Sequence, residues 1–168
     1  SPDGKRLLLA IKDQEDTTGK KKNNPMVIDR YHFKQDVSGY LYDKRKTHLY
    51  LFDVAAKRTD TLTRGNYNEG SMQWSPDGSA IAFVSNRTED PDKNSNNDIF
   101  VIAAMPGAEA KQLTSWKGSD GSPQWSPDGK MIIAANESAY NLHLFDTDTG
   151  REIRQFEGHQ LTISTVAF

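Results

Sequence analysis

Short apolar runs, each following a turn sequence, recur along the chain. The turn is Ser-Pro-Asp-Gly, in which Pro presets φ at the second position and Gly permits a left-handed exit. Its three copies lie at 1–4, 75–78 and 126–129. The apolar runs that follow lie at 5–11, 79–85 and 130–135. Runs of this length bounded by turns predict β-strands.

Each unit contains further strand-like runs. The second strands are expected at 47–54, 97–104 and 141–148, and the third at 58–63, 110–114 and 152–157. The runs that lead to the next turn lie at 70–74, 121–125 and 161–168. No segment keeps a 3.6-residue period, so almost no helix is expected. Four short strands per unit, repeated three times, predict an all-β chain of β-propeller blades.

The units give the expected organisation of one half-propeller domain. Blade 1 covers about 1–65 with an insertion at 13–46, blade 2 about 70–115, and blade 3 about 120–157. The apolar end Thr-Val-Ala-Phe would join the opening Ser-Pro-Asp-Gly as the internal units are joined. We therefore expect the strand 161–168 to pair with 5–11 and to complete blade 1.

Three blades are too few to close a ring, because propellers have 4–8. Two chains would supply six blades. The sequence thus predicts a homodimer that forms one six-bladed propeller, with the strand 161–168 of each chain completing the first blade of the other. Closure within one chain, or within a longer propeller, is the alternative.

Residues 1–130 resemble the propeller of prolyl-oligopeptidase-type serine peptidases, in the acylaminoacyl-peptidase branch, and related TolB-type propellers. The stretches that carry the resemblance are PMVIDRYHFKQDVSGYLYDKRKTHLYLFDV, LTRGNYNEGSMQWSPDGSAIAFVSNRTEDPD and KQLTSWKGSDGSPQWSPDGK. The resemblance implies that the aromatic-rich stretch 27–43 is an inserted hairpin that faces a catalytic domain in the peptidases.

Residues 126–168 resemble a WD-repeat instead. Phe145-Asp146 stands where the Trp-Asp pair of that repeat falls, and Gly158-His159 matches its opening Gly-His. Phe replaces the usual Trp. A change of lineage near 126–135 favours an engineered chimera over a natural mosaic, because propeller blades are modular.

Charge and composition argue against several partner classes. The net charge is −2, which is not the basic footprint of a nucleic-acid-binding or membrane-surface protein. The chain has no Cys, and therefore no disulfide framework or thiolate metal site. Neither a signal peptide nor an apolar run of membrane-spanning length is visible. The absence of an initiator Met indicates a processed, truncated or engineered piece, and localisation stays open.

No catalytic, cofactor-binding or metal-binding residue is assigned. The sequence lacks a G-x-S-x-G elbow, an H-E-x-x-H pair and a phosphate loop. The histidines have no ligand spacing; His48 and His143 are expected on strand faces, and His159 in a loop as a structural donor or exposed side chain. The four histidines are His32, His48, His143 and His159. The stretch 90–98 is interpreted as a hairpin loop rather than a calcium loop.

Three functions are consistent with these patterns. The first is a propeller scaffold without catalytic activity, and it is the one the sequence favours. The second is a WD-repeat-like module that binds a protein or peptide. The third is the substrate-gating propeller of a peptidase, detached from its enzyme. Trp74 and Trp125 are expected in the core between blades rather than in a ligand site.

Overall fold

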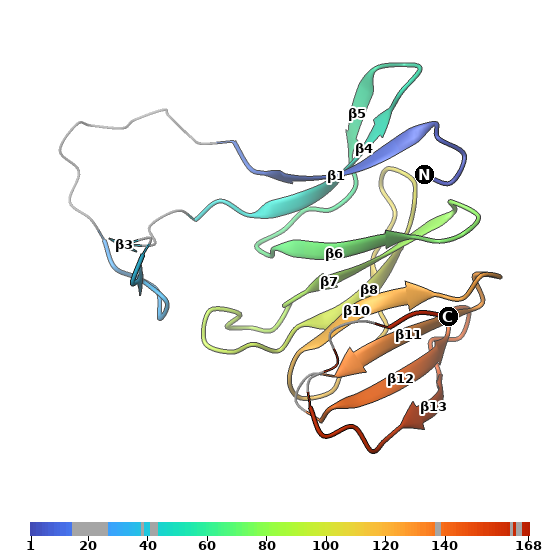
Figure 1. Ribbon diagram of the computed structural model, residues 1–168. Coiled ribbons are helices and arrows are strands. Elements are labelled where there is room, and N and C mark those ends of the chain that lie inside the picture. The colour runs from blue at the N-terminus through green and yellow to red at the C-terminus, as the bar shows by residue number, and fades with distance from the viewer. Residues whose placement is uncertain (15–26, 38, 41–43, 137–138, 162, 164–165) are drawn as a thin grey trace.

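The chain folds into stacked antiparallel sheets (Figure 1). The computed structural model describes residues 1–14, 27–37, 39–40, 44–136, 139–161, 163 and 166–168. The first sheet contains β1 (Arg6–Lys12), β4 (Thr47–Asp53) and β5 (Arg58–Thr61), in the order β1-β4-β5. The described residues contain no helix, so the prediction of an all-β fold is confirmed.

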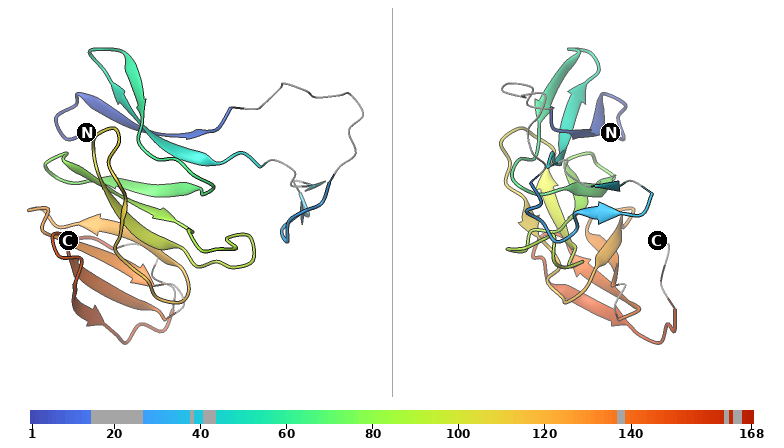
Figure 2. Two further views of the ribbon diagram at one scale, coloured as in Figure 1. Left: turned by 180° about the vertical axis from the view of Figure 1, so that it is seen from behind. Right: turned by 90° about the vertical axis from the view of Figure 1, so that its left-hand side faces the viewer.

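The other two large sheets have four strands each, in chain order. The second sheet contains β6 (Glu69–Trp74), β7 (Ala80–Ser85), β8 (Asp98–Ala103) and β9 (Lys111–Gln112). The third contains β10 (Asp120–Trp125), β11 (Met131–Asn136), β12 (Asn141–Asp146) and β13 (Glu152–Phe156). The predicted insertion carries a small hairpin of β2 (Lys34–Gln35) and β3 (Gly39–Tyr40), which projects to one side (Figures 1 and 2).

Alternating side chains fill the two spaces between the sheets. In the second sheet, Phe83 and Phe100 face the first sheet, whereas Ala82 and Ile99 face the third. This division follows from the two-residue period of a strand. The first-to-second space is built from Leu49, Leu51, Leu62, Ile81, Phe83, Phe100, Ile102 and Ala104. The second-to-third space is built from Ala82, Ile99, Leu113, Ile132, Ala134 and Phe145. Trp74 and Trp125 pack against these clusters, where the sequence places them.

The Ser-Pro-Asp-Gly turns hold the start of β1, β7 and β11 in the same way. In the second copy, the Gly78 N–H donates to the Ser75 carbonyl at 2.9 Å, and the Ser75 hydroxyl donates to Asp77 at 2.7 Å. Hydrogen bonds from Ser75 and Ser79 lower the pKa of Asp77 to about 2. The turns also lie on one another, because Pro2 approaches Gly78 and Pro76 approaches Gly129.

The third strand of each of the first two sheets is shorter than the apolar pattern predicts. β5 ends at Thr61 and β9 at Gln112, before a Leu-Thr pair. The threonine is the cause: the Thr63 hydroxyl accepts the Leu49 N–H at 2.8 Å, and the Thr114 hydroxyl accepts the Ile99 N–H at 2.9 Å. A side chain therefore replaces the backbone carbonyl in the ladder.

The expected pairing with the first sheet is not seen for residues 161, 163 and 166–168, the part of that segment that the structure describes. β1 pairs with β4 alone, and its other edge has no strand beside it in the described part of the chain. Val166 instead lies near β6 and β10. Pairing between two chains stays a prediction. The described residues also include no helix with the length and apolarity of a membrane crossing.

Candidate functional site: the inner-strand wall

The first strands of the second and third sheets, β6 and β10, lie side by side and carry nearly the same sequence. We call them the inner-strand wall: Gly-Ser-Met-Gln-Trp at 70–74 and Gly-Ser-Pro-Gln-Trp at 121–125. Each strand has a register irregularity there, between Gly70 and Gln73 or between Gly121 and Gln124. Bulges of this kind bend a strand and re-aim its side chains.

Two serines mark the bulges by their backbone conformation. Ser71 has φ of 46° and Ser122 has φ of 51°, in the left-handed region that non-glycine residues rarely adopt. Such strain persists only where the surrounding structure over-determines it, and it often accompanies a functional surface. Here both serines occupy the same position of their sheet.

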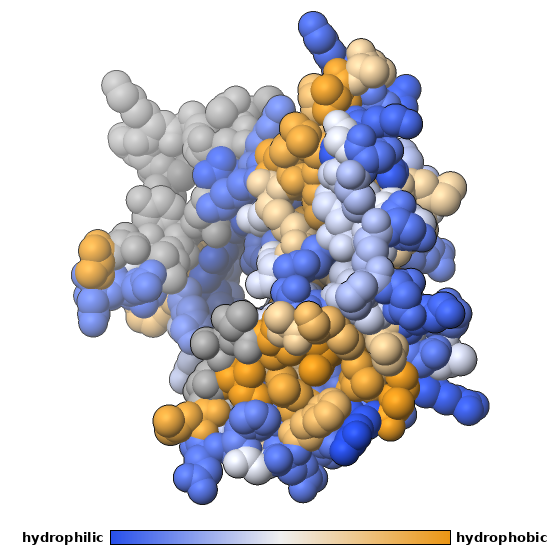
Figure 3. Space-filling view, turned by 45° about the vertical axis from the view of Figure 1, so that its right-hand side comes forward, coloured by the Kyte–Doolittle hydropathy of each residue, from blue (hydrophilic) through white to orange (hydrophobic). Residues whose placement is uncertain are grey.

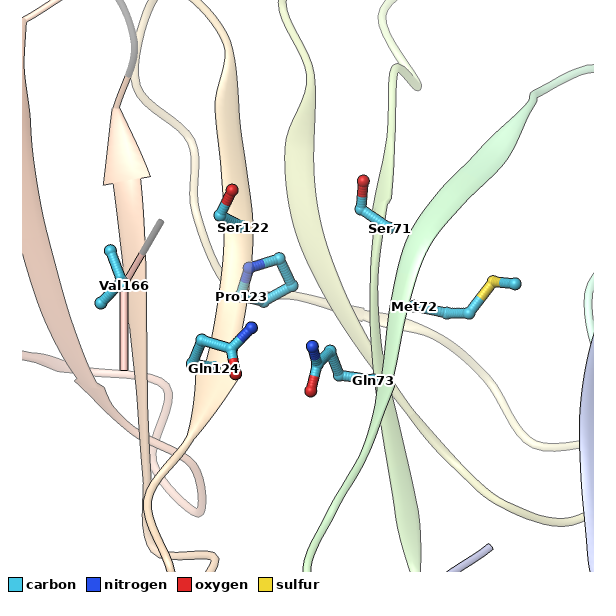
Figure 4. Close-up of a pocket in the computed structure, with 7 residues that line it drawn as sticks. All are labelled: Ser71, Met72, Gln73, Ser122, Pro123, Gln124 and Val166. Atoms are coloured by element: carbon cyan, nitrogen blue, oxygen red, sulfur yellow. The ribbon is translucent and has the colours of Figure 1, made fainter. Parts of the chain in front are cut away.

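A cavity of about 250 Å³ lies along the wall (Figure 4). In this view the Gln73 and Gln124 side chains point toward each other across the gap between the strands, and Ser71 and Ser122 point to a common side. The lining residues are Ser71, Met72, Gln73, Ser122, Pro123, Gln124 and Val166. Val166 is 8% exposed, so the chain already places one apolar side chain of its own in this cavity.

The polar side chains of the wall have no hydrogen-bond partner within the described part of the chain. These side chains are Ser71, Gln73, Ser122 and Gln124, whereas the Gln73 backbone carbonyl accepts the Trp125 Nε1–H at 3.3 Å. That bond fixes the spacing of the two strands. The Gln amides and the Ser hydroxyls both donate and accept hydrogen bonds, which is the chemistry that pairs with a peptide backbone.

Behind the wall, a buried polar cluster joins the first and second sheets. Glu69 begins β6, and its Oε2 lies 2.9 Å from His48 Nδ1 and 3.1 Å from the Thr63 hydroxyl. Arg87 donates to Glu69 Oε1 at 3.3 Å, and its guanidinium lies 4.4 Å from the Phe100 ring centroid. The buried Glu69 carboxylate thus has three partners. Removing Arg87 would leave the Glu69 charge uncompensated, so we expect this cluster to hold the two sheets together.

The equivalent cluster between the second and third sheets contains two carboxyl groups. Asn136 donates to Asp120 Oδ1 at 2.7 Å, and Thr114 donates to Asp98 Oδ1 at 3.3 Å. Burial, with the neighbouring Asp120 carboxylate, raises the pKa of Asp98 to about 6. Burial also raises the pKa of Asp120. No Lys or Arg pairs with either carboxyl group in the described residues, in contrast to Arg87 of the first cluster, and among ionisable neighbours only the nearby His143 acts against the raised pKa of Asp120.

The histidines lie apart from one another, and none meets a serine hydroxyl in the described residues. His143 bonds Glu152 Oε1 at 3.0 Å and stacks on Trp116 with 3.9 Å between ring centroids. The His32 N–H donates to Asp92 at 3.1 Å. His159 is exposed. His48 and His143 therefore sit on strands, as the pattern predicts, but their carboxylate partners are not visible in the pattern.

The Asn-rich loop between β7 and β8 holds itself together. Asn86 Nδ2 donates to Asn94 Oδ1 at 2.9 Å, and Asn94 Nδ2 donates to the Asp90 carbonyl at 2.8 Å. Further along the loop, Asn97 Nδ2 donates to the Ser119 hydroxyl at 3.0 Å and Asn96 Oδ1 accepts the Gly118 N–H at 2.9 Å, so the loop amides are occupied by the loop and by the segment before β10. Among the described residues no group of three His, Asp, Glu or Cys side chains is placed to hold a metal ion.

Comparison with known proteins agrees with the stacked-sheet architecture. The family model of the TolB beta propeller domain matches residues 34–151. The Tol-Pal system protein TolB of Alcanivorax borkumensis is 34% identical over 91 residues, which cover 54% of this chain and 20% of that protein. An uncharacterized peptidase of Bacillus subtilis, YuxL, is 29% identical over 91 residues, which cover 54% of this chain and 13% of the peptidase.

A solved structure shows the same fold over more of the chain. The β-propeller domain of the Trilobed protease from Pyrococcus furiosus superposes with a TM-score of 0.60 at 14% identity, covering 94% of this chain and 41% of that one. This chain therefore spans only a minor part of each of these proteins. The repeated strands and turns, with the family match over 34–151, show that the chain belongs to the TolB beta propeller domain family.

Proposed function

We propose that the chain is a propeller scaffold without catalytic activity, which binds an extended protein segment along the inner-strand wall. The observation that carries this proposal is the repeated set of polar side chains without partners, at Ser71, Gln73, Ser122 and Gln124, around a cavity of about 250 Å³. The buried Val166 shows that an apolar side chain can be accommodated beside them. Strand edges and polar grooves of this kind bind peptides through main-chain hydrogen bonds.

Peptide selection tests the binding function. The 168-residue chain is used to select from a displayed library of twelve-residue peptides, and the affinity of the selected peptides is measured by calorimetry. Gln73→Arg and Gln124→Arg place a bulky cation in the cavity and are expected to weaken binding at least tenfold. Gln155→Arg, on the exposed outer strand β13, is the matched control. Equal loss in all three variants, or no selected peptide, contradicts the proposal.

Turnover tests the non-catalytic part. The purified chain is expected to hydrolyse an acyl-alanine nitroanilide no faster than buffer. The supporting observations are the missing G-x-S-x-G sequence and the separation of the histidines from serine hydroxyls in the described structure. Hydrolysis that disappears when one specific serine is replaced would show that the chain is an enzyme.

A detached peptidase propeller is the second candidate, and the inserted segment favours it. Val27, Ile28, Tyr31, Phe33 and Val37 are each at least 40% exposed, which is a large apolar content for one projecting segment. The similarity to a peptidase of Bacillus subtilis points the same way. Co-expression with the α/β-hydrolase domain of a prolyl-oligopeptidase-type peptidase tests this function. Stable co-purification that Tyr31→Asp and Phe33→Asp abolish would support it.

We also propose a mixed origin for the chain, in which a WD-repeat-like segment over 126–168 was joined to a TolB-like segment. One observation supports this origin: Phe145-Asp146 closes β12 where a WD-repeat has Trp-Asp. The family match, which runs on to residue 151, opposes a join as early as residue 126. We propose that the joining was engineered. A genomic sequencing read that runs without a break across codons 110–150 would contradict that origin.

A further inference from the structure

A second cavity lies at the end of β7 opposite its Ser-Pro-Asp-Gly turn. It has a volume of about 280 Å³, and its lining comes from Lys46, from residues 66–68 between β5 and β6, and from the loop between β7 and β8. In Figure 1 this end of the second sheet lies on the side toward which the inserted hairpin projects, whereas Figure 3 shows the side chains of another face. The cavity shares no lining residue with the inner-strand wall. Its chemistry therefore needs an explanation of its own.

Part of the lining is held in place by hydrogen bonds within the loop. Asn86 Nδ2 donates to Asn94 Oδ1 at 2.9 Å, and Asn86 Oδ1 accepts the Thr88 hydroxyl at 2.7 Å. Asn94 Nδ2 donates to the Thr88 hydroxyl oxygen at 3.0 Å and to the Asp90 carbonyl at 2.8 Å. These two amides therefore form a wall of fixed shape, and a preformed wall lowers the entropy cost of binding a ligand.

Other polar groups of the lining are not used by the protein. The Asn66 amide, the Tyr67 hydroxyl and the Ser95 hydroxyl have no hydrogen-bond partner among the described residues. Asn68 Oδ1 accepts the Thr47 N–H at 3.0 Å, and the Asn68 Nδ2 group has no partner in the same part of the chain. Two separate segments thus bring unused donors and acceptors to one cavity.

The equivalent place between the second and third sheets is bridged by a hydrogen bond. Lys46 and Asn96 are equivalent, because each lies three residues before a strand residue whose N–H bonds a threonine hydroxyl. Tyr67 and Gly118 are equivalent, because each lies two residues before the buried acid that begins β6 or β10. The Gly118 N–H donates to Asn96 Oδ1 at 2.9 Å. A lysine side chain has no acceptor, so this bond cannot form beside Lys46, and the cavity lies there instead.

The unused groups of the cavity match the hydroxyls of a sugar. Amides and hydroxyls both donate and accept hydrogen bonds, as the adjacent hydroxyls of a sugar ring do. Five of the nine lining residues are Asn, so an apolar ligand would bury amides without partners. Pro91 and the Tyr67 ring add apolar surface on which the C–H face of a sugar can pack.

Size and charge narrow the ligand further. Sites for drug-sized ligands have volumes of about 300–1,000 Å³. A cavity of about 280 Å³ is therefore suited to one ring rather than to a long chain. No carboxylate lines the cavity, and Lys46 is its one charged lining residue. A divalent cation, which needs oxygen ligands of negative charge, is thus not favoured.

We propose that this cavity binds a single sugar ring, which is either a free monosaccharide or the terminal residue of a glycan. The Asn66 amide, the Asn68 Nδ2 group and the Ser95 hydroxyl bond the sugar hydroxyls. The paired amides of Asn86 and Asn94 hold the loop that carries Ser95. The site is separate from the inner-strand wall, and this inference does not depend on peptide binding.

A glycan array tests the class of ligand, and calorimetry separates its two sources. The 168-residue chain is applied to an array of neutral and acidic mono- and oligosaccharides. The best-bound terminal sugar is then titrated both as the free monosaccharide and as the glycan that ends in it. Affinities within tenfold of each other support a free sugar as the ligand, and a larger preference for the glycan supports a terminal residue. An array on which no sugar is bound contradicts the proposal.

Two pairs of variants test the location of the site. Ser95→Trp fills the cavity, and Asn66→Leu removes an amide with little change of size, so each should weaken sugar binding at least tenfold. Ser115→Trp and Asn141→Leu lie outside the lining and are the matched controls, expected to bind as the unaltered chain does.

Thermal melts show whether each variant is folded. If Ser95→Trp lowers the melting temperature, Asn66→Leu decides, because Asn66 is exposed and makes no hydrogen bond within the described residues. Sugar binding that Asn66→Leu leaves unchanged, or that the control variants weaken equally, overturns the proposal.

Discussion

Buried charged residues at equivalent positions join neighbouring sheets. Between the first and second sheets, Glu69 meets His48 and Arg87, and between the second and third, Asp120 meets Asn136 near Asp98. The first cluster has a cationic partner in Arg87. The second has two carboxyl groups whose pKa values are both raised, mainly by burial. We therefore expect a change of pH to affect the packing of the second sheet on the third through this cluster.

Replacing Asp98 with Asn should reduce the pH dependence of stability. The folded-state pKa of Asp98 is about 6, above the ordinary 3.8, so the folded chain holds this proton more tightly than the unfolded chain. The stability that this tightly held proton contributes is fully present below about pH 4 and is lost as the pH rises through 6. We expect Asp98→Asn to raise the free energy of unfolding at pH 7.5 by about 1–3 kcal/mol, with little change at pH 4. Urea titrations at both pH values measure this. A larger gain at pH 4 than at pH 7.5 would contradict the assignment.

Arg6 should stabilise the contact between the first and second sheets. Its guanidinium donates to the Ala104 carbonyl at 2.6 Å and the Gly78 carbonyl at 2.8 Å, and lies 5.1 Å from the Trp74 ring centroid. Arg6→Met keeps the chain length but removes the donors, and should lower the free energy of unfolding by about 1.5–3 kcal/mol. Lys5→Met, at an exposed position, is the control. Equal stability of the two variants would show that the bonds contribute nothing.

At the scale of elements, the sequence predicts most strands and the turns because their signals are local. The pattern Ser-Pro-Asp-Gly followed by an apolar run places the start of β7 and β11 within about one residue. The early end of β5 and the contact between His48 and Glu69 are not predictable in this way. They depend on contacts between residues far apart in the chain, such as the 21-residue separation of that pair. The bulges at Ser71 and Ser122 do have one signal in the sequence, which is the repeated Gly-Ser-x-Gln-Trp.

Two glycines of the turns allow the effect of turn stacking to be separated from backbone strain. Gly4 has φ of 70° and Gly78 has φ of 72°, but a Cβ on Gly78 would lie 3.2 Å from Pro2 Cδ, and a Cβ on Gly4 would meet nothing within 4 Å. Gly4→Ala should destabilise by about 1 kcal/mol, and Gly78→Ala by more, because it adds a close contact to the same strain. Thermal melts of the two variants measure the difference. A smaller effect at Gly78 would contradict the stacking.

At the scale of the whole molecule, the described residues form three stacked sheets of antiparallel strands. The sequence predicts the all-β architecture from its repeats and the family from its resemblance to TolB-type propellers, and the structure adds the position of Val166 in the wall. The repeats could not reveal that position, because it depends on contacts between residues far apart in the chain.

Calorimetry with the selected peptides tests the central claim of this account most directly, that the inner-strand wall binds an extended protein segment. We expect the unaltered chain and Gln155→Arg to bind these peptides with the same affinity, and Gln73→Arg and Gln124→Arg to bind them at least tenfold more weakly. The physical reason is that a bulky cation at either glutamine fills the cavity that these side chains line. The same affinity in the unaltered chain and all three variants would contradict the account.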